Sequence, residues 1–572
     1  MAPAAAQKAP APQAAPEKDP FADIPFDLEL DKKKQDEIWL GEHVTFELEA
    51  RFGKRFVAAW KARDEEQFRA MLLPGFLANA APEFRRELAH EFVSQRSGVA
   101  DEDRQPVDAA AWTAQLFAAS REFARFAWTT IRVLQIERKP EQPHRWMTRI
   151  LLGAAGEDAA GQLIEFSSEH AVVFEIPEDA TQADQVPVIE SWSPIRQNFL
   201  TAKHSMFREV THEYGLDEIG VDDNWKLPVE KVVQYRFQMA VDDFDRDGWL
   251  DLAIAEKNRS RLLRWSPEKQ RFEDVTSAIG VIPMHILFGN PVDLAGWIDY
   301  DNDGYPDLLL GNRLYHNDAG RHFTDVTSKS GLTMRIQGMG VQIADYDADG
   351  LLDIYILYQA NHETKRPERL RWIAEVRHGE KNQLWRNLGN GQFEDVTERA
   401  NAGAGLRQHF AGAWFHYDDD QYPDIYTAND FSPNVLLRNL GNGTFEDVSD
   451  SSGGTAYATS MGVAAGDTDN NGTSDLYIAN MFSKMGRRII SHVCADDYPA
   501  GVFEQVKGSC SGNQLYRRQA GDLRYNDVGE QMAVHGVGWA YAPALADFDN
   551  DGWLDIYATT GFLSFERGKP DG

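Results

Sequence analysis

Six short stretches rich in aspartate recur in the second half of the chain, and their spacing suits a hard cation. Side-chain oxygens stand at the first, third, fifth and ninth positions, and glycine stands at the sixth position in five of the stretches. The residue at the seventh position could add a backbone carbonyl. Ca²⁺ takes several oxygen ligands on a flexible loop, whereas Mg²⁺ requires a stricter octahedron and zinc prefers nitrogen and sulfur. The pattern therefore predicts about four to six bound calcium ions per chain.

The predicted metal ligands all come from these six Asp loops. They are Asp243, Asp245, Asp247, Trp249, Asp251, Asp299, Asp301, Asp303, Tyr305, Asp307, Asp345, Asp347, Asp349, Leu351, Asp353, Asp418, Asp420, Asp424, Asp467, Asp469, Asn471, Thr473, Asp475, Asp547, Asp549, Asp551, Trp553 and Asp555. The fourth loop is degenerate, because His416 replaces the first aspartate and Gln421 replaces the glycine. That loop could bind a cation, or it could be held by hydrogen bonds alone.

The Asp loops allow two other interpretations, turns without an ion and EF-hands. Clusters of Asp, Asn and Gly often form turns without any ion, but four carboxylates that converge in one loop would repel each other strongly without a cation. The start of each loop matches an EF-hand, which also needs Glu at the twelfth position. That position holds Ile254 in the first loop, and a strand is expected to follow instead of a helix. Repetition at a fixed spacing favours calcium.

A second motif, Phe-x-Asp/Glu-Val, alternates with the Asp loops. It occurs at 207–210, 272–275, 323–326, 393–396, 445–448 and, with Tyr in place of Phe, at 525–528. An Asn-x-Leu-aromatic segment lies between the two motifs, as at 382–385, and Asn-Gly pairs mark tight hairpin turns. One unit is thus about four short strands, the size of a propeller blade.

The ends of the repeat array indicate a closed ring. The first Phe motif, at 207, has no Asp loop before it, and the last Asp loop, at 547, has no Phe motif after it. Both facts are explained if the segment at 207 completes the blade that begins at 547, because closure removes exposed sheet edges. We therefore predict a mainly β fold, a β-propeller of six blades, with seven as the alternative.

These motifs resemble the FG-GAP/VCBS repeat, which builds integrin-α-like β-propellers. The stretches at 386–396 and 438–448, Arg-Asn-Leu-Gly-Asn-Gly-x-Phe-Glu-Asp-Val, resemble the cartilage-acidic-protein and ASPIC/UnbV branch. The resemblance covers about residues 207–565. It implies a secreted or surface-exposed propeller with calcium in its loops, used for adhesion or for binding protein or glycan partners. The chain departs from the pattern in its extra N-terminal domain and in stopping at Gly572, without the further C-terminal domain of many relatives.

The first 200 residues differ from the repeats in composition and in predicted secondary structure. Residues 1–34 form an Ala/Pro-rich tail and linker without the apolar stretch of a signal peptide, and 35–200 are expected to form a smaller α+β domain. Within it, helices are predicted at 64–72 and 83–95, followed by strands at 126–138, 144–152, 162–177 and 187–193. This order loosely resembles the nuclear-transport-factor-like cone. Residues 201–572 form the predicted propeller.

The net charge and the cysteine content bear on the partners and the location of the protein. Lys and Arg number 58 against 90 Asp and Glu, a net charge of −32, which argues against nucleic acid and anionic lipid as partners. No apolar run is long enough to insert into a membrane. Together with the family resemblance, this predicts a secreted, periplasmic or cell-surface protein. Such a setting favours a disulfide between Cys494 and Cys510, with two free thiols as the alternative.

Two insertions interrupt the repeats, at about 360–381 and 481–512. The first is locally basic and could anchor an acidic partner, or it could be a solvated helix. The favoured function is a calcium-binding module for protein or glycan partners, in which no residue is catalytic. One alternative is a carbohydrate-active or oxidative enzyme, with His409, His535 and Ser460 lining a central channel. The other is a structural subunit of a larger assembly.

Overall fold

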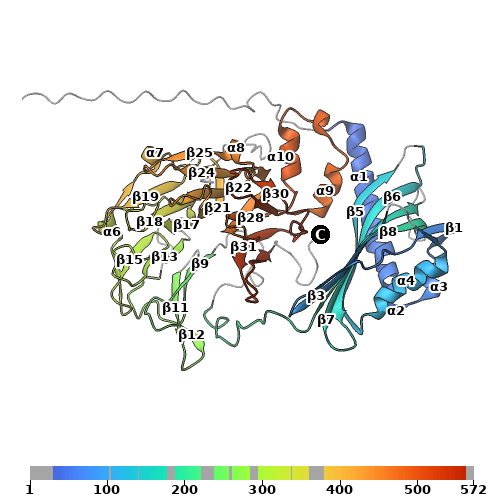
Figure 1. The fold of residues 1–572 in the computed structure, drawn as a ribbon, viewed down its shortest axis with the longest axis horizontal. Helices are drawn as coiled ribbons and strands as arrows, with labels where there is room; N and C mark the ends of the chain where they lie inside the picture. Colours follow the sequence, from blue (N-terminus) through green and yellow to red (C-terminus); the bar gives the residue numbers. More distant parts are fainter. Residues whose placement is uncertain are drawn as a thin grey trace, which may run out of the picture.

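The computed structural model describes residues 30–101, 105–138, 141–176, 187–220, 237–256, 260–283, 294–335, 338–359 and 379–561. Most of the first insertion, and most of the tail predicted over 1–34, lie outside these ranges. The described chain is mainly β, as the sequence predicts, and it forms an N-terminal unit followed by a series of small antiparallel sheets (Figure 1). None of its helices, within those ranges, is long and apolar enough to cross a membrane.

The N-terminal unit is a mainly antiparallel sheet with helices packed against it (Figure 1). The helices are α1 (Lys32–Glu47), the π-helix η1 (Leu48–Gly53), α2 (Lys54–Ala62), α3 (Glu65–Arg69) and α4 (Ala109–Arg121). The strands are β1 (Leu72–Asn79), β2 (Arg86–Ala89), β3 (Val93–Val99), β4 (Pro106–Val107), β5 (Arg125–Arg138), β6 (Arg145–Glu157), β7 (Leu163–Glu175) and β8 (Val188–Ala202). The main path runs β2-β3-β8-β7-β6-β5, with β1 parallel to β8 and paired also with β4.

Aromatic side chains at helical spacing form the core of this unit. Phe52, Phe56 and Trp60 are four residues apart and fully buried, so they lie on one face of η1 and α2. The ring of Phe56 stacks on Trp192 of β8 at 5.2 Å between centroids. Burying such rings supplies most of the driving force that holds helices on a sheet.

The helix predicted over 83–95 is wrong, because this segment forms the hairpin of β2 and β3. Arg86 lies opposite Ser97 in the hairpin. β3 also pairs along its whole length with β8, so that Val93 lies opposite Ala202. Pairing with a strand about a hundred residues away overrides the local helical pattern. The other predicted helix, at 64–72, is limited to α3, and β1 begins at Leu72.

Among the described residues, and besides one small two-stranded pair, a series of five four-stranded sheets and a final two-stranded sheet follows in chain order. They are β9 (Phe237–Asp242), β10 (Asp251–Glu256), β11 (Ser260–Ser266) and β12 (Arg271–Asp274); β13 (Ala295–Ile298), β14 (Asp307–Leu310), β15 (Arg313–Asn317) and β16 (Phe323–Asp325); β17 (Gly338–Ala344), β18 (Asp353–Tyr358), β19 (Gln383–Asn387) and β20 (Phe393–Asp395); β21 (Gln408–Phe415), β22 (Asp424–Asp430), β24 (Val435–Asn439) and β25 (Phe445–Asp447); β27 (Ser460–Gly466), β28 (Asp475–Asn480), β29 (Gln514–Arg517) and β30 (Asn526–Asp527); and β31 (Ala540–Ala546) with β32 (Asp555–Thr560). Short elements between them are α6 (Thr327–Ser330), α7 (Thr397–Ala400), α8 (Ser449–Ser452) and the pair β23 (Ser432–Pro433) and β26 (Tyr457–Ala458).

Successive sheets pack side by side through their first strands. β9 contacts β13, and the series continues through β17, β21 and β27 to β31. At the outer side, the aromatic residue at the second position of an Asp loop packs on the Phe motif of the next sheet, as Tyr300 does on Phe393 at 6.2 Å. The same packing joins Phe244 to Phe323, Tyr346 to Phe445 and Tyr417 to Tyr525. This arrangement is the one expected of neighbouring propeller blades.

The segment at 207 lies beside the last sheet. The ring of Phe207 contacts Phe548 at 5.4 Å and Tyr557 at 5.5 Å between centroids. Phe207 thus lies against Phe548 as the Phe motif of a following sheet lies against the loop before it, so the contact does not show that 207 completes the blade that begins at 547; residues 207–210 form no strand, and the last sheet has two strands among the described residues. The number of blades therefore stays a prediction.

The second insertion is helical and contacts the N-terminal unit (Figure 1). It contains α9 (Lys484–Ile490), the 3₁₀ helix η3 (Ala495–Asp497) and α10 (Val502–Gly508), and α9 packs against β5. The guanidinium of Arg488 donates to both carboxylate oxygens of Glu42, at 3.0 and 2.7 Å, and to the carbonyl of Val133 at 2.8 Å. Lys34 forms an ion pair with Asp497.

The predicted disulfide inside this insertion is absent, and both thiols are free. Cys494 is exposed at the start of η3, whereas Cys510 is buried against α9 near Gly486. Burial raises the pKa of the Cys510 thiol to about 11. The helices between the two residues place the thiols in different surroundings, and contact with the N-terminal unit orders the insertion instead of a bridge.

Candidate metal centres in the Asp loops

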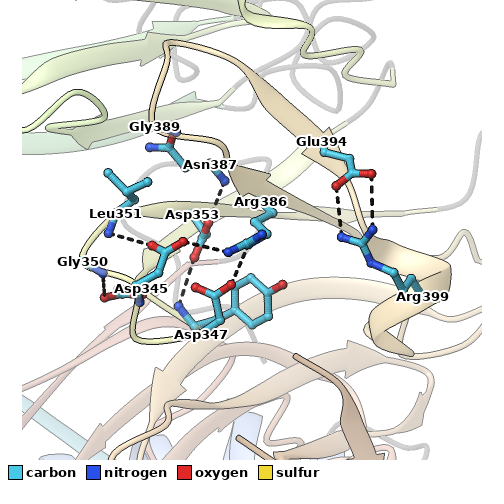
Figure 2. Close-up of polar contacts among 12 residues, drawn as sticks. Asp345, Asp347, Gly350, Leu351, Asp353, Arg386, Asn387, Gly389, Glu394 and Arg399 are labelled. Atoms are coloured by element: carbon cyan, nitrogen blue, oxygen red, sulfur yellow. Dashed lines mark hydrogen bonds and ion pairs between the residues drawn. The ribbon is translucent and has the colours of Figure 1, made fainter. Parts of the chain in front are cut away.

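Each Asp loop connects the first and second strands of its sheet, and the third loop illustrates the backbone (Figure 2). Ala348, at the fourth position, and Gly350, at the sixth, both have left-handed backbone conformations, with φ of 57° and 86°. The glycine avoids the strain that a side chain would suffer there. The corresponding residues of the other four regular loops share these conformations. In the degenerate loop Asp419 has φ of 63°, but Gln421 is not left-handed.

The first and fifth carboxylates organise the loop. Asp345 accepts hydrogen bonds from the backbone N–H of Asp349 at 3.1 Å and of Gly350 at 2.8 Å, and Asp349 accepts one from Leu351 at 3.0 Å (Figure 2). The same set of bonds is made by Asp243 with Asp247, Asp299 with Asp303, Asp467 with Asn471 and Asp547 with Asp551. These bonds turn the side-chain oxygens toward the inside of the loop.

The ninth carboxylate joins the loop to the sheet. Asp353 is fully buried, and its two oxygens accept hydrogen bonds from the N–H of Tyr346 at 3.1 Å and of Asn387 at 2.7 Å. Burial raises the pKa of Asp353 to about 7. Asp251, Asp307 and Asp424 make the corresponding bonds and have pKa values raised to about 7 for the same reason. This structural role was not evident from the sequence.

The third carboxylate has one oxygen held by an arginine and one oxygen left over. Oδ2 of Asp347 accepts from Nε of Arg386 at 2.6 Å, and Nη2 of the same arginine lies 2.8 Å from Asp349 (Figure 2). Within the described residues, Oδ1 of Asp347 is buried without a hydrogen-bond partner. Asp418 repeats this arrangement with Arg438, whereas Asp245 and Asp469 form longer ion pairs with Arg264 at 3.7 Å and with Arg517 at 4.0 Å; Oδ1 of all three is buried and unpartnered among the described residues.

These unpartnered oxygens fit a cation. A buried carboxylate oxygen without a partner costs free energy, and one potential ligand oxygen from each of Asp345, Asp347 and Asp353 lies within 4.8 Å of the others. Burial is the main cause of the raised pKa of Asp347, and the neighbouring carboxylates add to it. An all-oxygen set of this kind suits Ca²⁺, which would neutralise the crowded charge. These arginines position the third-position carboxylates, and this role was not predicted from the sequence. In the third and fourth loops, the Arg that precedes Asn387 and Asn439 could have indicated it.

The second loop differs, because His316 stands where the other loops have arginine. Its Nδ1 lies 3.3 Å from Oδ2 of Asp301 and 3.2 Å from Oδ1 of Asp307. The fourth loop lacks the first carboxylate altogether, since His416 replaces it, yet Asp424 still fastens the loop to its sheet. The loop can therefore keep its shape by hydrogen bonds even where the ligand set is incomplete.

Neighbouring repeats are tied together beside the loops. The side chain of Asn387 is buried and donates to the carbonyl of Tyr300, in the preceding loop, at 2.8 Å and to Leu352, in its own loop, at 3.1 Å. Asn317 and Asn439 make the same pair of bonds. Asn302 also donates to the carbonyl of Gly350, in the next loop, at 2.9 Å. These asparagine staples explain the Asn of the Arg-Asn-Leu-Gly motif.

The residues proposed for a catalytic alternative lie in different surroundings, and Oγ of Ser460 and Nδ1 of His535 are buried without a hydrogen-bond partner among the described residues. His409 is fully buried, with Nδ1 2.8 Å from the side-chain oxygen of Asn429, and burial lowers its pKa to about 4. Nε2 of His535 lies 3.0 Å from Arg487 in the second insertion. Ser460 is buried at the start of β27. Both ring nitrogens of His409 thus have partners, because Nε2 lies 3.3 Å from the carbonyl of Gly405, and this residue is a satisfied core histidine.

Comparison with known proteins agrees with the repeat geometry. The family described as FG-GAP-like repeat matches residues 243–310, 299–356 and 416–478. The chain thus carries FG-GAP-like repeats, and the resemblance predicted from its motifs is confirmed. Each match runs from an Asp loop into the second strand of the next sheet.

Among curated proteins the chain is similar to cartilage acidic protein 1. It is 25% identical over 386 residues to the protein of Xenopus tropicalis, covering 57% of this chain and 58% of that one. It is 23% identical over 387 residues to the mouse protein, with the same shares covered. The chain therefore spans less than two thirds of these relatives. A solved Agrocybe aegerita lectin that recognises non-reducing terminal N-acetylglucosamine matches 78% of this chain and 90% of its own, at 11% identity and a TM-score of 0.28. That score is too low to support an argument.

Proposed function

We propose that this chain is an exported, calcium-stabilised β-propeller of six blades that serves as a binding module for a protein or glycan partner. The observation that carries the calcium assignment is the buried, unpartnered third-position oxygen found in four of the Asp loops. The binding role rests on the FG-GAP-like repeats and on the similarity to cartilage acidic protein 1.

The calcium ions would act on structure. In the third loop, Asp345, Asp347, Asp349 and Asp353 would supply carboxylate oxygens and Leu351 a backbone carbonyl. The bound ion would offset repulsion among the carboxylates and fix the edge of each sheet. Because the folded loops bind the ion and the unfolded chain does not, calcium would stabilise the fold by mass action.

Exposed aromatic side chains beside the loops offer a surface for a partner. Trp249 and Trp553, at the seventh positions of the first and last loops, are 47% and 51% exposed. Flat aromatic rings are enriched at protein contacts and combine a large apolar area with a polar N–H group. Calcium would hold these tryptophans by fixing the loops that carry them.

Metal content and thermal stability test the calcium assignment. Mass spectrometry of metals should find about four to six calcium ions per chain, and EDTA should lower the melting temperature markedly. Asp347→Ala should remove one ion. Asp318→Ala, at an exposed aspartate outside the Asp loops, should leave the calcium content unchanged. The assignment would be refuted if the chain contained no calcium and its melting temperature were the same with and without EDTA.

A further inference from the structure

The N-terminal unit reaches the last Asp loop through a single histidine. His90 stands at the turn of the β2–β3 hairpin, where its backbone N–H donates to the carbonyl of Val93 at 2.8 Å. Its Nδ1 lies 3.5 Å from Oδ2 of Asp549, and its Nε2 lies 3.4 Å from Oδ2 of Asp551. A residue of the N-terminal unit thus faces two carboxylates of the sixth loop, which are separated from it by more than four hundred positions.

One ion could bind only one nitrogen of the imidazole, because the lone pairs of the two nitrogens point apart, so Nδ1 of His90 and Oδ2 of Asp549 are the pair that one ion could join. Nitrogen–oxygen hydrogen bonds are usually about 2.7–3.2 Å long, shorter than both separations. With metal–ligand bonds of about 2.0–2.1 Å, two ligands of a tetrahedral zinc ion lie about 3.3 Å apart. The potential ligand atoms of His90, Asp549 and Asp551 all lie within 4.8 Å of one another. One imidazole nitrogen and two carboxylate oxygens are a common type of ligand set for a divalent ion.

Among the described residues, no arginine lies beside the third-position carboxylate of the sixth loop, as one does in the first, third, fourth and fifth loops. Arg386 in the third loop comes from the third strand of its sheet, but the sheet of β31 and β32 has two strands among the described residues. His90 lies beside the third-position carboxylate, as that arginine does. The side chain of Asp549 is only 9% exposed beneath it.

We infer that His90 and the sixth Asp loop together form a divalent-cation site between the N-terminal unit and the repeats. The imidazole makes this site more favourable to zinc and similar ions than the all-oxygen loops are. An ion bound there would fasten the β2–β3 hairpin to the last sheet. The inference rests on the loop geometry of the proposed function and assigns Asp549 and Asp551 of the sixth loop to an ion other than calcium, so the calcium assignment of the remaining loops is tested separately.

Zinc titration of the full chain in calcium-containing buffer tests the site. Calorimetry should detect one Zn²⁺ that His90→Ala binds at least tenfold more weakly, because a nitrogen ligand is lost. His144→Ala, at an exposed histidine in the turn between β5 and β6, is the matched control and should bind zinc normally. Hydrogen exchange should show that zinc slows the amides of residues 86–99 in the wild type but not in His90→Ala.

The outcomes separate the two proposals. If His90→Ala binds zinc as the wild type does, or if zinc leaves hairpin exchange unchanged, the interdomain site is refuted. Calcium content and the effect of EDTA are measured on the same samples. His90-dependent zinc binding in a chain without calcium would support the interdomain site and refute the calcium assignment alone.

Discussion

The asparagine staple at Asn387 provides the sharpest prediction for stability. In Asn387→Ala the backbone N–H remains, so the hydrogen bond to Asp353 is kept, and only the side-chain bonds are lost. Those bonds run to Tyr300 and Leu352, and the side-chain oxygen accepts a third from the N–H of Gly389 at 3.0 Å.

The expected cost follows from counting these bonds. Each hydrogen bond contributes about 0.5–1.5 kcal/mol, and each buried group left unpaired adds about 1–3 kcal/mol. Some of the freed groups can reach water, so we expect Asn387→Ala to lower the free energy of unfolding by about 2–4 kcal/mol. Asn387→Asp keeps the volume but points a carboxylate at two carbonyls, and it should destabilise at least as much.

Urea unfolding followed by tryptophan fluorescence, in calcium-containing buffer, measures this difference. Asn390→Ala changes an exposed asparagine in the turn of the same hairpin and should shift the free energy by less than about 0.5 kcal/mol. If Asn387→Ala is as mild as Asn390→Ala, the staple contributes little. If Asn387→Asp is well tolerated, packing and not hydrogen bonding explains why the residue is buried.

Three further predictions concern other parts of the chain. Arg488→Ala leaves the largely buried Glu42 unpaired, so it should destabilise by about 3–5 kcal/mol in thermal or urea unfolding. Lys507→Ala, at an exposed lysine of the same insertion, is the control. If Arg488→Ala destabilises no more than this control, the prediction is wrong. In the native protein Cys494 should react with a thiol reagent while Cys510 reacts only after unfolding, and a chain without free thiols would refute that. Burial lowers the pKa of His170 to about 3, below the 6.5 of an exposed histidine. The unfolded chain therefore takes up a proton first, and stability should fall as pH drops from 6.5 toward 3, by at most about 1.4 kcal/mol per pH unit. His170→Gln should flatten this slope, and an unchanged slope would show that other groups cause it.

The repeated part of the chain was largely predictable, because its signals are local. The Asp loops lie between the first and second strands, and the Phe motifs at 272, 323, 393 and 445 begin or lie in fourth strands. Gly350 illustrates why: its left-handed backbone follows from residue type and position within the loop, without reference to distant parts of the chain.

The features that were missed depend on contacts between distant segments. The residues around His90 have a helical pattern, but they form a hairpin whose second strand pairs with β8. The disulfide was expected from compartment and spacing, whereas the fold of the second insertion depends on the pair formed by Arg488 and Glu42, 446 positions apart. Arg386 is 39 positions from Asp347, so its place above the third-position carboxylate could not be inferred from the loop alone.

The asparagine staples also bear on how such an array can grow. Asn387 donates to the preceding repeat, and the carbonyl of Tyr346 in the same repeat accepts from Asn439 of the following one. Within the part of the array joined by Asn317, Asn387 and Asn439, an in-frame duplication or loss of one whole repeat would therefore leave each of these donors matched to an acceptor. Gene rearrangement could therefore change the number of these sheets without leaving a buried hydrogen-bonding group unpaired. The limit on the number of sheets would come from the geometry of closing the ring.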